Sequence, residues 1–168
     1  MPALNPVIMP MTKAASQRQH TLSGLLLPLT GSNLLLPNAA VVEVSGYPET
    51  IEPVAGAPDW YLGHFDWRGL SLPLVRWERL MGRPVAADPA TRKSAAICHL
   101  FSAGHAGSFV GLETSGLPRL VTVTEAGLKA KADSAAPGSC VMGKVRVQDT
   151  MAYIPDLDAL GGIILSLG

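Results

Sequence analysis

Cys98, His99 and His105 are the side chains in this sequence that could act as a nucleophile and a general base. Cys98 and His99 are neighbours in a segment whose composition predicts a strand, so their side chains should point to opposite faces of a sheet. The sequence around them has neither the glycine elbow nor the oxyanion motif that accompanies many hydrolytic nucleophiles. A small β-barrel hydrolase or ligand-binding protein that uses these three residues is therefore the alternative interpretation and not the leading one.

Metal and phosphate sites have little support in the sequence. Cys98 and Cys140 lie far apart, so they form neither a metal-ligand pair nor a disulfide framework. Gly104 and Gly107 lack the strand-to-helix context and the Lys-Ser/Thr ending of a phosphate loop. The histidines also lack metal-ligand spacing: they are His20, His64, His99 and His105. We therefore expect no metal and no cofactor, and we interpret both cysteines as small buried apolar residues.

Arg68 stands beside Gly69 at a polar corner between two short apolar runs, within residues 60–75. These runs are rich in leucine and aromatic residues, a composition that fits half-buried strands. Gly69 tolerates the positive φ of a tight turn, and such a turn would present Arg68 to solvent. An arginine head group can hold a carboxylate through two hydrogen bonds or stack on an aromatic ring, and arginine is enriched among interface hot spots. The corner thus indicates protein binding rather than catalysis.

Glu43 is a charged residue inside the apolar run 39–44, so it requires either solvent or a cationic partner. An ion pair between Glu43 and Arg68 within the chain is therefore an alternative to contact with another protein. A bond from Arg68 to Asp66 or to the backbone is a second alternative. Val41 and Val44, on either side of Glu43, are better suited to the core than to an interface.

Three tryptophans lie near the same corner. Trp67 is the one we expect to be exposed, because it stands next to the turn. Trp60 and Trp77 are assigned to the core, since a small barrel needs large side chains to fill it.

Short strands separated by glycine- and proline-rich turns account for most of the chain. A hairpin is expected over residues 25–36, and a strand over 70–75 leads to a helical turn that Gly82 closes. Residues 83–93 are the best candidate for a linker. Further strands are expected over 94–101, 108–113, 117–124, 140–147 and 151–154, with a helical turn at 156–160. Strands at a spacing of roughly 8–12 residues indicate small barrels or a sandwich.

The composition limits the functions available to the chain. Of its 168 residues, 48% are hydrophobic and 15% charged, which provides enough apolar material for a packed core. A formal net charge of zero argues against a nucleic-acid-binding domain and makes self-association easier. Residues 1–20 are rich in proline and lack the apolar core of a signal peptide, so we expect a flexible arm. Prolines and polar turns interrupt the apolar stretch 22–44, which predicts no membrane insertion.

A set of residues in a fixed order extends from the corner along most of the chain. In the first half these are Glu43-Val44-x-Gly46-Tyr47, Pro58, Gly63, Arg68-Gly69, Pro73 and Leu80-x-Gly82. In the second half they are Val110-Gly111-Leu112 and residues 154–160. This order resembles the CheW-like family of chemotaxis adaptors, from Leu22 onward. In its divergent character the chain also resembles CheW-like proteins of pilus or twitching-motility chemosensory clusters, such as the ChpC type.

The resemblance implies an all-β fold of two small five-stranded SH3-like barrels, packed through a hydrophobic seam, with short helical turns and no active site. It also implies a division of the chain into an arm at residues 1–20 and a CheW-like domain at 21–168. The first barrel would comprise about 21–82 plus the chain end, and the second about 94–154.

Adaptors of this family connect the cytoplasmic tip of a methyl-accepting chemoreceptor to the regulatory domain of the histidine kinase CheA. The resemblance therefore implies a non-enzymatic adaptor in chemotaxis or twitching-motility signalling, located in the cytoplasm and recruited to membrane-bound receptor arrays. The expected partner-binding residues lie at the corner and on the earlier apolar run: Val41, Glu43, Val44, Asp66, Trp67, Arg68 and Gly69.

Three positions depart from the family pattern. The family usually has Asn at the position of Asp66, and Asp at the positions of Arg76 and Ser115. Arg76 reverses a charge, which would alter the electrostatic matching between this chain and a partner. These departures leave the expected fold unchanged and bear on which kinase and receptor the chain binds.

Overall fold

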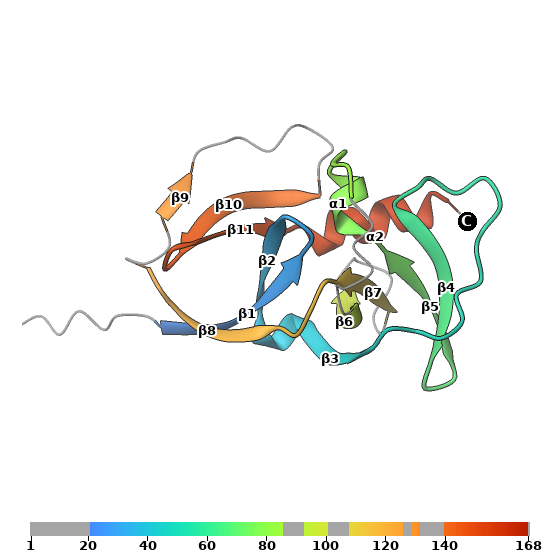
Figure 1. The fold of residues 1–168 in the computed structure, drawn as a ribbon, viewed down its shortest axis with the longest axis horizontal. Helices are drawn as coiled ribbons and strands as arrows, with labels where there is room; N and C mark the ends of the chain where they lie inside the picture. Colours follow the sequence, from blue (N-terminus) through green and yellow to red (C-terminus); the bar gives the residue numbers. More distant parts are fainter. Residues whose placement is uncertain (1–20, 86–92, 101–107, 126–128, 132–139, 168) are drawn as a thin grey trace, which may run out of the picture.

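In the computed structural model, the chain folds into two β-sheets that share a hydrophobic core (Figure 1). The structure describes residues 21–85, 93–100, 108–125 and 140–167, and residues 129–131 by their backbone alone. Two helices and one 3-10 turn accompany the strands: α1 (Trp77–Leu80), α2 (Leu157–Leu165) and η1 (Asn38–Ala40). Within the described ranges, no helix has the length and apolar character needed to cross a membrane. The all-β prediction is confirmed.

Sheet A has six strands in the order β8-β1-β2-β11-β10-β9. Their bounds are β1 (Thr21–Leu29), β2 (Ser32–Pro37), β8 (Arg119–Thr124), β9 (Lys129–Lys131), β10 (Val141–Val147) and β11 (Thr150–Pro155). β1 and β2 form the hairpin expected from the sequence, and Gly31 in its turn has a φ of +79°. A parallel pairing of β2 with β11 joins this hairpin to the β10–β11 hairpin.

Sheet B has five strands in the order β3-β6-β7-β5-β4. Their bounds are β3 (Val41–Gly46), β4 (Tyr61–Trp67), β5 (Leu70–Val75), β6 (Ser94–Leu100) and β7 (Ser108–Thr114). β4 and β5 are the two apolar runs around the corner at Arg68, and they pair as an antiparallel hairpin. A parallel pairing of β5 with β7 connects that hairpin to the rest of the sheet.

The strands are distributed differently from the expected division into barrels at about 21–82 and 94–154. β1 and β2 share sheet A with the strands that follow residue 118, whereas β6 and β7 complete sheet B. β6 is buried along nearly its whole length, and a strand that is buried on both faces takes a central position in a sheet. The expected boundaries between the barrels are therefore wrong. Residues 1–20, the expected flexible arm, lie outside the described residues.

A shared core forms the seam between the two sheets. Leu27 of β1 points into this seam, and its neighbour Leu26 points into the separate core of sheet A, as alternation along a strand requires. Side chains from sheet B and from both helices complete the seam: Val75, Trp77, Ala96, Cys98, Val110, Leu112, Leu157 and Leu160. Each fully buried leucine contributes about 1.5–3 kcal/mol relative to an exposed one, so this seam holds the two sheets together. Trp77 is fully buried there and Trp60 is half-buried against it, in line with their assignment to the core.

Candidate protein-binding site

The turn between β4 and β5 places Arg68 at the tip of a hairpin. Arg68 has a φ of +53° and Gly69 a φ of +80°, the two positive values that tight two-residue hairpin turns require. The backbone N–H of Gly69 donates to Oδ1 of Asp66 across this turn at 3.4 Å. The Arg68 side chain is 69% exposed. The structure therefore places Arg68 at the surface, as the sequence predicted.

Arg68 also forms an ion pair within the chain. Its Nη2 donates to Oε2 of Glu43 at 2.5 Å, and its guanidinium carbon lies 5.1 Å from the centre of the Trp67 ring. Glu43 is on β3 and Arg68 follows β4, the strands at opposite ends of the sheet B order. The ion pair therefore bridges the two edges of sheet B. The pairing that the sequence left as an alternative is correct, and most of the Arg68 head group still faces solvent.

Trp67, Val41 and Val44, three of the expected partner-binding residues, are all half-buried. The Trp67 ring is half-buried and lies 5.3 Å from the ring of Phe109 on β7. Val41 and Val44 are half-buried and pack against the seam. The expectation that Trp67 is the exposed tryptophan is therefore only half met, and the two valines belong to the core side of β3, as their composition suggested.

Two exposed apolar residues of this region were not predicted from the sequence. Val42 on β3 is 41% exposed and Leu70, which follows the turn, is 47% exposed. Leu70 lines a groove of about 300 Å³ between the hairpin and the end of α2. The groove is lined mainly by apolar side chains: Leu70, Leu72, Leu100, Phe109, Ile164 and Leu165. An exposed cation beside an apolar groove is an arrangement typical of protein recognition sites.

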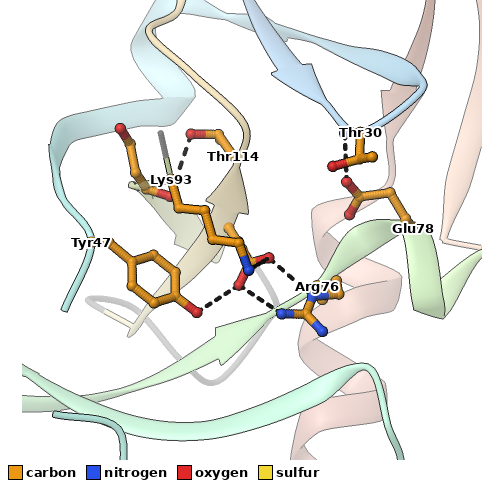
Figure 2. Close-up of polar contacts among 8 residues, drawn as sticks. Thr30, Tyr47, Arg76, Glu78, Lys93 and Thr114 are labelled. Carbon is orange, nitrogen blue, oxygen red and sulfur yellow. Dashed lines mark hydrogen bonds and ion pairs between the residues drawn. The ribbon is translucent and has the colours of Figure 1, made fainter. Parts of the chain in front are cut away.

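A buried carboxylate, Glu113 on β7, joins several segments of the chain. Figure 2 shows the three residues that contact it, Tyr47, Arg76 and Lys93. Arg76 donates to both of its oxygens, from Nε at 3.0 Å and from Nη2 at 3.2 Å. The Tyr47 hydroxyl donates to Oε2 at 2.6 Å, and Lys93 Nζ lies 3.3 Å from Oε1. Arg76 therefore reverses the family's charge at a position where it faces a buried acid. This departure thus has a counterpart within the chain, the carboxylate of Glu113.

The electrostatics of this cluster favour the carboxylate form of Glu113. Burial by itself raises the pKa of Glu113, but hydrogen bonds from Arg76 and Tyr47 and the positive charges of Arg76 and Lys93 outweigh it and lower the pKa. Burial, and the bond to Glu113, raise the pKa of Tyr47, so its hydroxyl remains a donor. Tyr47 directly follows β3, so the cluster fixes the strand that carries Glu43.

A second buried acid links the two sheets. Oε1 of Glu78 on α1 accepts a hydrogen bond of 2.8 Å from the backbone N–H of Thr30, in the turn between β1 and β2 (Figure 2). The backbone N–H of Ser115, another departure from the family pattern, donates to the carbonyl oxygen of Pro28 at 2.8 Å, a bond that does not depend on the serine side chain. Neither contact involves the hairpin at Arg68.

The residues of the alternative enzymatic interpretation do not form a site in the described part of the chain. Cys98 is completely buried in the seam, and burial raises the pKa of its thiol to about 12. Burial, and then the charge of Asp156, raise the pKa of Cys140 to about 11. The His99 ring lies 5.2 Å from that of Phe109, and His105 lies outside the described residues. A thiol that stays protonated is a poor nucleophile, so a hydrolase based on Cys98 has no support here.

We expect both thiols to resist modification while the chain is folded. At pH 8, a disulfide reagent such as DTNB should label neither Cys98 nor Cys140 on the time scale of minutes, because both are buried and protonated. The same reagent should label both at once in denaturant, which serves as the control. Rapid labelling of Cys98 in the folded protein would contradict this account and revive the nucleophile hypothesis.

Comparisons with known proteins agree with this geometry. The sequence model of the CheW-like domain family matches residues 23–162. Among solved structures, the chain is similar to the scaffolding protein TtCheW from Thermoanaerobacter tengcongensis, with a TM-score of 0.66 and 16% identity. That similarity covers 80% of this chain and 88% of the other. No curated protein matches the chain.

At 16% identity the structural likeness concerns the fold, and it confirms two SH3-like barrels packed through a seam. Sheet B has the five strands expected of each barrel, and sheet A has six because the short strand β9 is added to its edge. The family match extends over most of the residues, including both sheets and the hairpin at Arg68. The chain therefore belongs to the family of CheW-like domains.

Proposed function

We propose that this protein is a non-enzymatic adaptor that couples chemoreceptors to a CheA-type histidine kinase. Membership of the CheW-like family supports this role, and the similar solved structure is named as a scaffolding protein. The observation that carries the proposal is the hairpin tip, where Arg68 remains 69% exposed beside an apolar groove. The partners would be the regulatory domain of the kinase and the cytoplasmic tip of a methyl-accepting receptor, so the adaptor would work in the cytoplasm at membrane-bound receptor arrays.

The Arg68–Glu43 pair suits a surface that must exchange partners. An exposed ion pair contributes only about 0–1 kcal/mol, so a carboxylate of another protein can replace Glu43 at little cost. The guanidinium would then direct the partner, and the apolar groove would supply the buried area. Such an adaptor transmits a signal only through interfaces whose free energy differs between receptor states, and it needs no bond-making step.

Replacing Arg68 with alanine should weaken binding without unfolding the chain. We expect the affinity for the kinase regulatory domain or for the receptor tip to fall roughly tenfold or more, the effect of losing a hot-spot arginine. The melting temperature should change by no more than about 2–4 °C, because the ion pair with Glu43 is exposed. Isothermal titration and thermal unfolding measure the two quantities.

Arg119→Ala is the matched control for this variant. Arg119 is an exposed arginine on β8, in the other sheet, so its removal should leave binding unchanged. Unchanged affinity of the Arg68→Ala variant for both partners would contradict the proposed site. Failure of the unmodified protein to bind any CheA-type kinase of its own cell would contradict the adaptor role itself.

We further infer that the adaptor serves a pilus or twitching-motility cluster rather than a flagellar one. The ChpC-like character of the sequence supports this assignment. Pull-down with all CheA-type kinases from one cell would test it, because a flagellar kinase that binds as tightly as the pilus-associated one contradicts this assignment.

A further inference from the structure

Two cations lie close to one aromatic ring at the margin of the seam, on the outer face of sheet A, which is the face opposite its own core. The guanidinium carbon of Arg83 lies 5.1 Å from the centre of the Tyr153 ring, and Nζ of Lys144 lies 5.4 Å from it. Arg83 also donates to the Tyr153 hydroxyl. Arg146 is two residues beyond Lys144 on β10, so it lies on the same face, and it is exposed. Three cations and a half-buried tyrosine thus share one surface.

The neighbouring strand extends this surface with more positive charge. In the register of β9 with β10, Lys131 stands opposite Lys144 and Lys129 stands opposite Arg146. Residues directly opposite each other share a face of a sheet, and like charges in such pairs are destabilising. The described ion pairs of the chain involve Arg68, Arg76, Arg79 and Lys93. Arg83, Lys144 and Arg146 therefore have no carboxylate partner among the described residues.

This concentration of charge is local and does not follow from the composition. The chain as a whole has a formal net charge of zero. The β10–β11 hairpin, residues 141–155, contains one acid, Asp149, which lies in its turn. A fold that accumulates like charges on one face, against their mutual repulsion, gains free energy when an anion covers that face.

The edge of the sheet indicates which kind of anion fits. β9 is the last strand in the order of sheet A, so on its outer side no described strand pairs with its backbone. An extended polypeptide can add to such an edge through main-chain hydrogen bonds, with alternate side chains on each face. Lipid headgroups and nucleic acids have no peptide backbone to pair in this way. The edge therefore favours a protein segment over the other polyanions.

We propose that the outer face of β9, β10 and β11 docks an extended acidic segment of another protein. Its carboxylates would meet Arg83, Lys144 and Arg146, and its backbone would add to the edge of sheet A at β9. Figure 1 places β9 at the end of the molecule away from the β4–β5 hairpin, and β10 extends between β9 and the middle of the molecule near α1. The proposal therefore goes beyond the adaptor function at Arg68, and both surfaces can be occupied together.

Fluorescence anisotropy with a labelled peptide of alternating glutamate and threonine tests this docking surface. The unmodified protein should bind the peptide at low salt, and the double variant Lys144→Glu/Arg146→Glu should bind it roughly tenfold or more weakly. Arg119→Glu, on the edge strand β8 of the same sheet, is the matched control and should bind normally. A peptide N-methylated at alternate residues should also bind more weakly, because it cannot form the edge hydrogen bonds.

The double variant should melt close to the temperature of the unmodified protein, because Lys144 and Arg146 are not buried and have no carboxylate partner among the described residues. If it fails to fold, Lys144→Gln/Arg146→Gln replaces it, with the same expected loss of peptide binding. Equal binding of the peptide by the unmodified protein and the folded variant would overturn the proposal. Absence of peptide binding by the unmodified protein would also overturn it. Binding to phosphatidylserine vesicles, or self-association in sedimentation, that weakens in the double variant would then identify a different occupant of this face. No receptor or kinase enters the assay, so its failure is distinct from failure of the adaptor role.

Discussion

Replacing Glu113 with alanine is expected to lower the free energy of unfolding by about 3 kcal/mol, the cost of removing one partner from a buried ion pair. The variant would leave Arg76 without its two carboxylate contacts and the Tyr47 hydroxyl without its acceptor. Stability of a folded domain is only about 5–15 kcal/mol, so the loss is a large share of the total. Urea unfolding at pH 7 measures it.

Glu43→Ala is the matched control for this variant. Glu43 is also a glutamate of sheet B that pairs with an arginine, but its side chain is one-third exposed and Arg68 is more exposed still. Its removal should cost no more than about 1 kcal/mol. A loss as small for Glu113→Ala as for Glu43→Ala would contradict the structural role assigned to the buried cluster.

The same cluster predicts a dependence of stability on pH. Because the pKa of Glu113 is lower in the folded chain than in the unfolded one, its ionisation stabilises the fold. This contribution is complete above the unfolded-state pKa and is lost as pH falls through the folded-state pKa. The difference in unfolding free energy between the unmodified protein and the Glu113→Gln variant should therefore shrink as the solution is acidified. A difference that grows on acidification would contradict the direction of the shift.

Local patterns predicted the hairpins well. The β4–β5 hairpin appears where the apolar runs of residues 60–75 meet Gly69, and the β1–β2 hairpin where residues 25–36 are interrupted by Gly31. In both, the turn chemistry and the alternation of side chains are encoded within a few neighbouring residues. That is also why Arg68 could be placed at the surface without a structure.

The grouping of strands into sheets could not be predicted in the same way. The parallel pairs β2–β11 and β5–β7 join segments far apart in the sequence, and pairing at that range leaves no local pattern. Helix α2 was underestimated for a related reason. Its two central glycines disfavour a helix, but Ile163 and Ile164, which follow them, pack against the seam in the same way as Leu157 and Leu160 before them, and this packing offsets that preference.

Glu113 shows which signal in the sequence was overlooked. It is a charged residue at the end of an apolar strand, the same feature that drew attention to Glu43. Applied consistently, the rule that a buried charge needs a partner would have paired Glu113 with a cation. The identity of that cation, Arg76, depends on the contact between β5 and β7 and required the structure.

Gly63→Ala is expected to be about as damaging as loss of Glu113, and the reason is backbone geometry. Gly63 has a φ of +134°, a conformation that other residues rarely adopt. A Cβ atom at this position would lie 2.2 Å from the carbonyl oxygen of Glu52. Glu52 cannot move away easily, because it exchanges two backbone hydrogen bonds with His64, at 2.7 and 2.8 Å. We expect a loss of about 2–5 kcal/mol from strain and overlap combined.

Gly46→Ala is the control that separates this effect from a general cost of replacing glycine. Gly46 ends β3 in the same sheet, and a Cβ there would meet no atom within 4 Å. Its substitution should leave the urea midpoint unchanged or raise it slightly, because alanine restricts the unfolded chain. If the two variants unfold at the same urea concentration, the connector 47–60 is not held against β4 at Gly63. The hairpin that presents Arg68 would then lack the bulged, rigid base that the position of Gly63 implies.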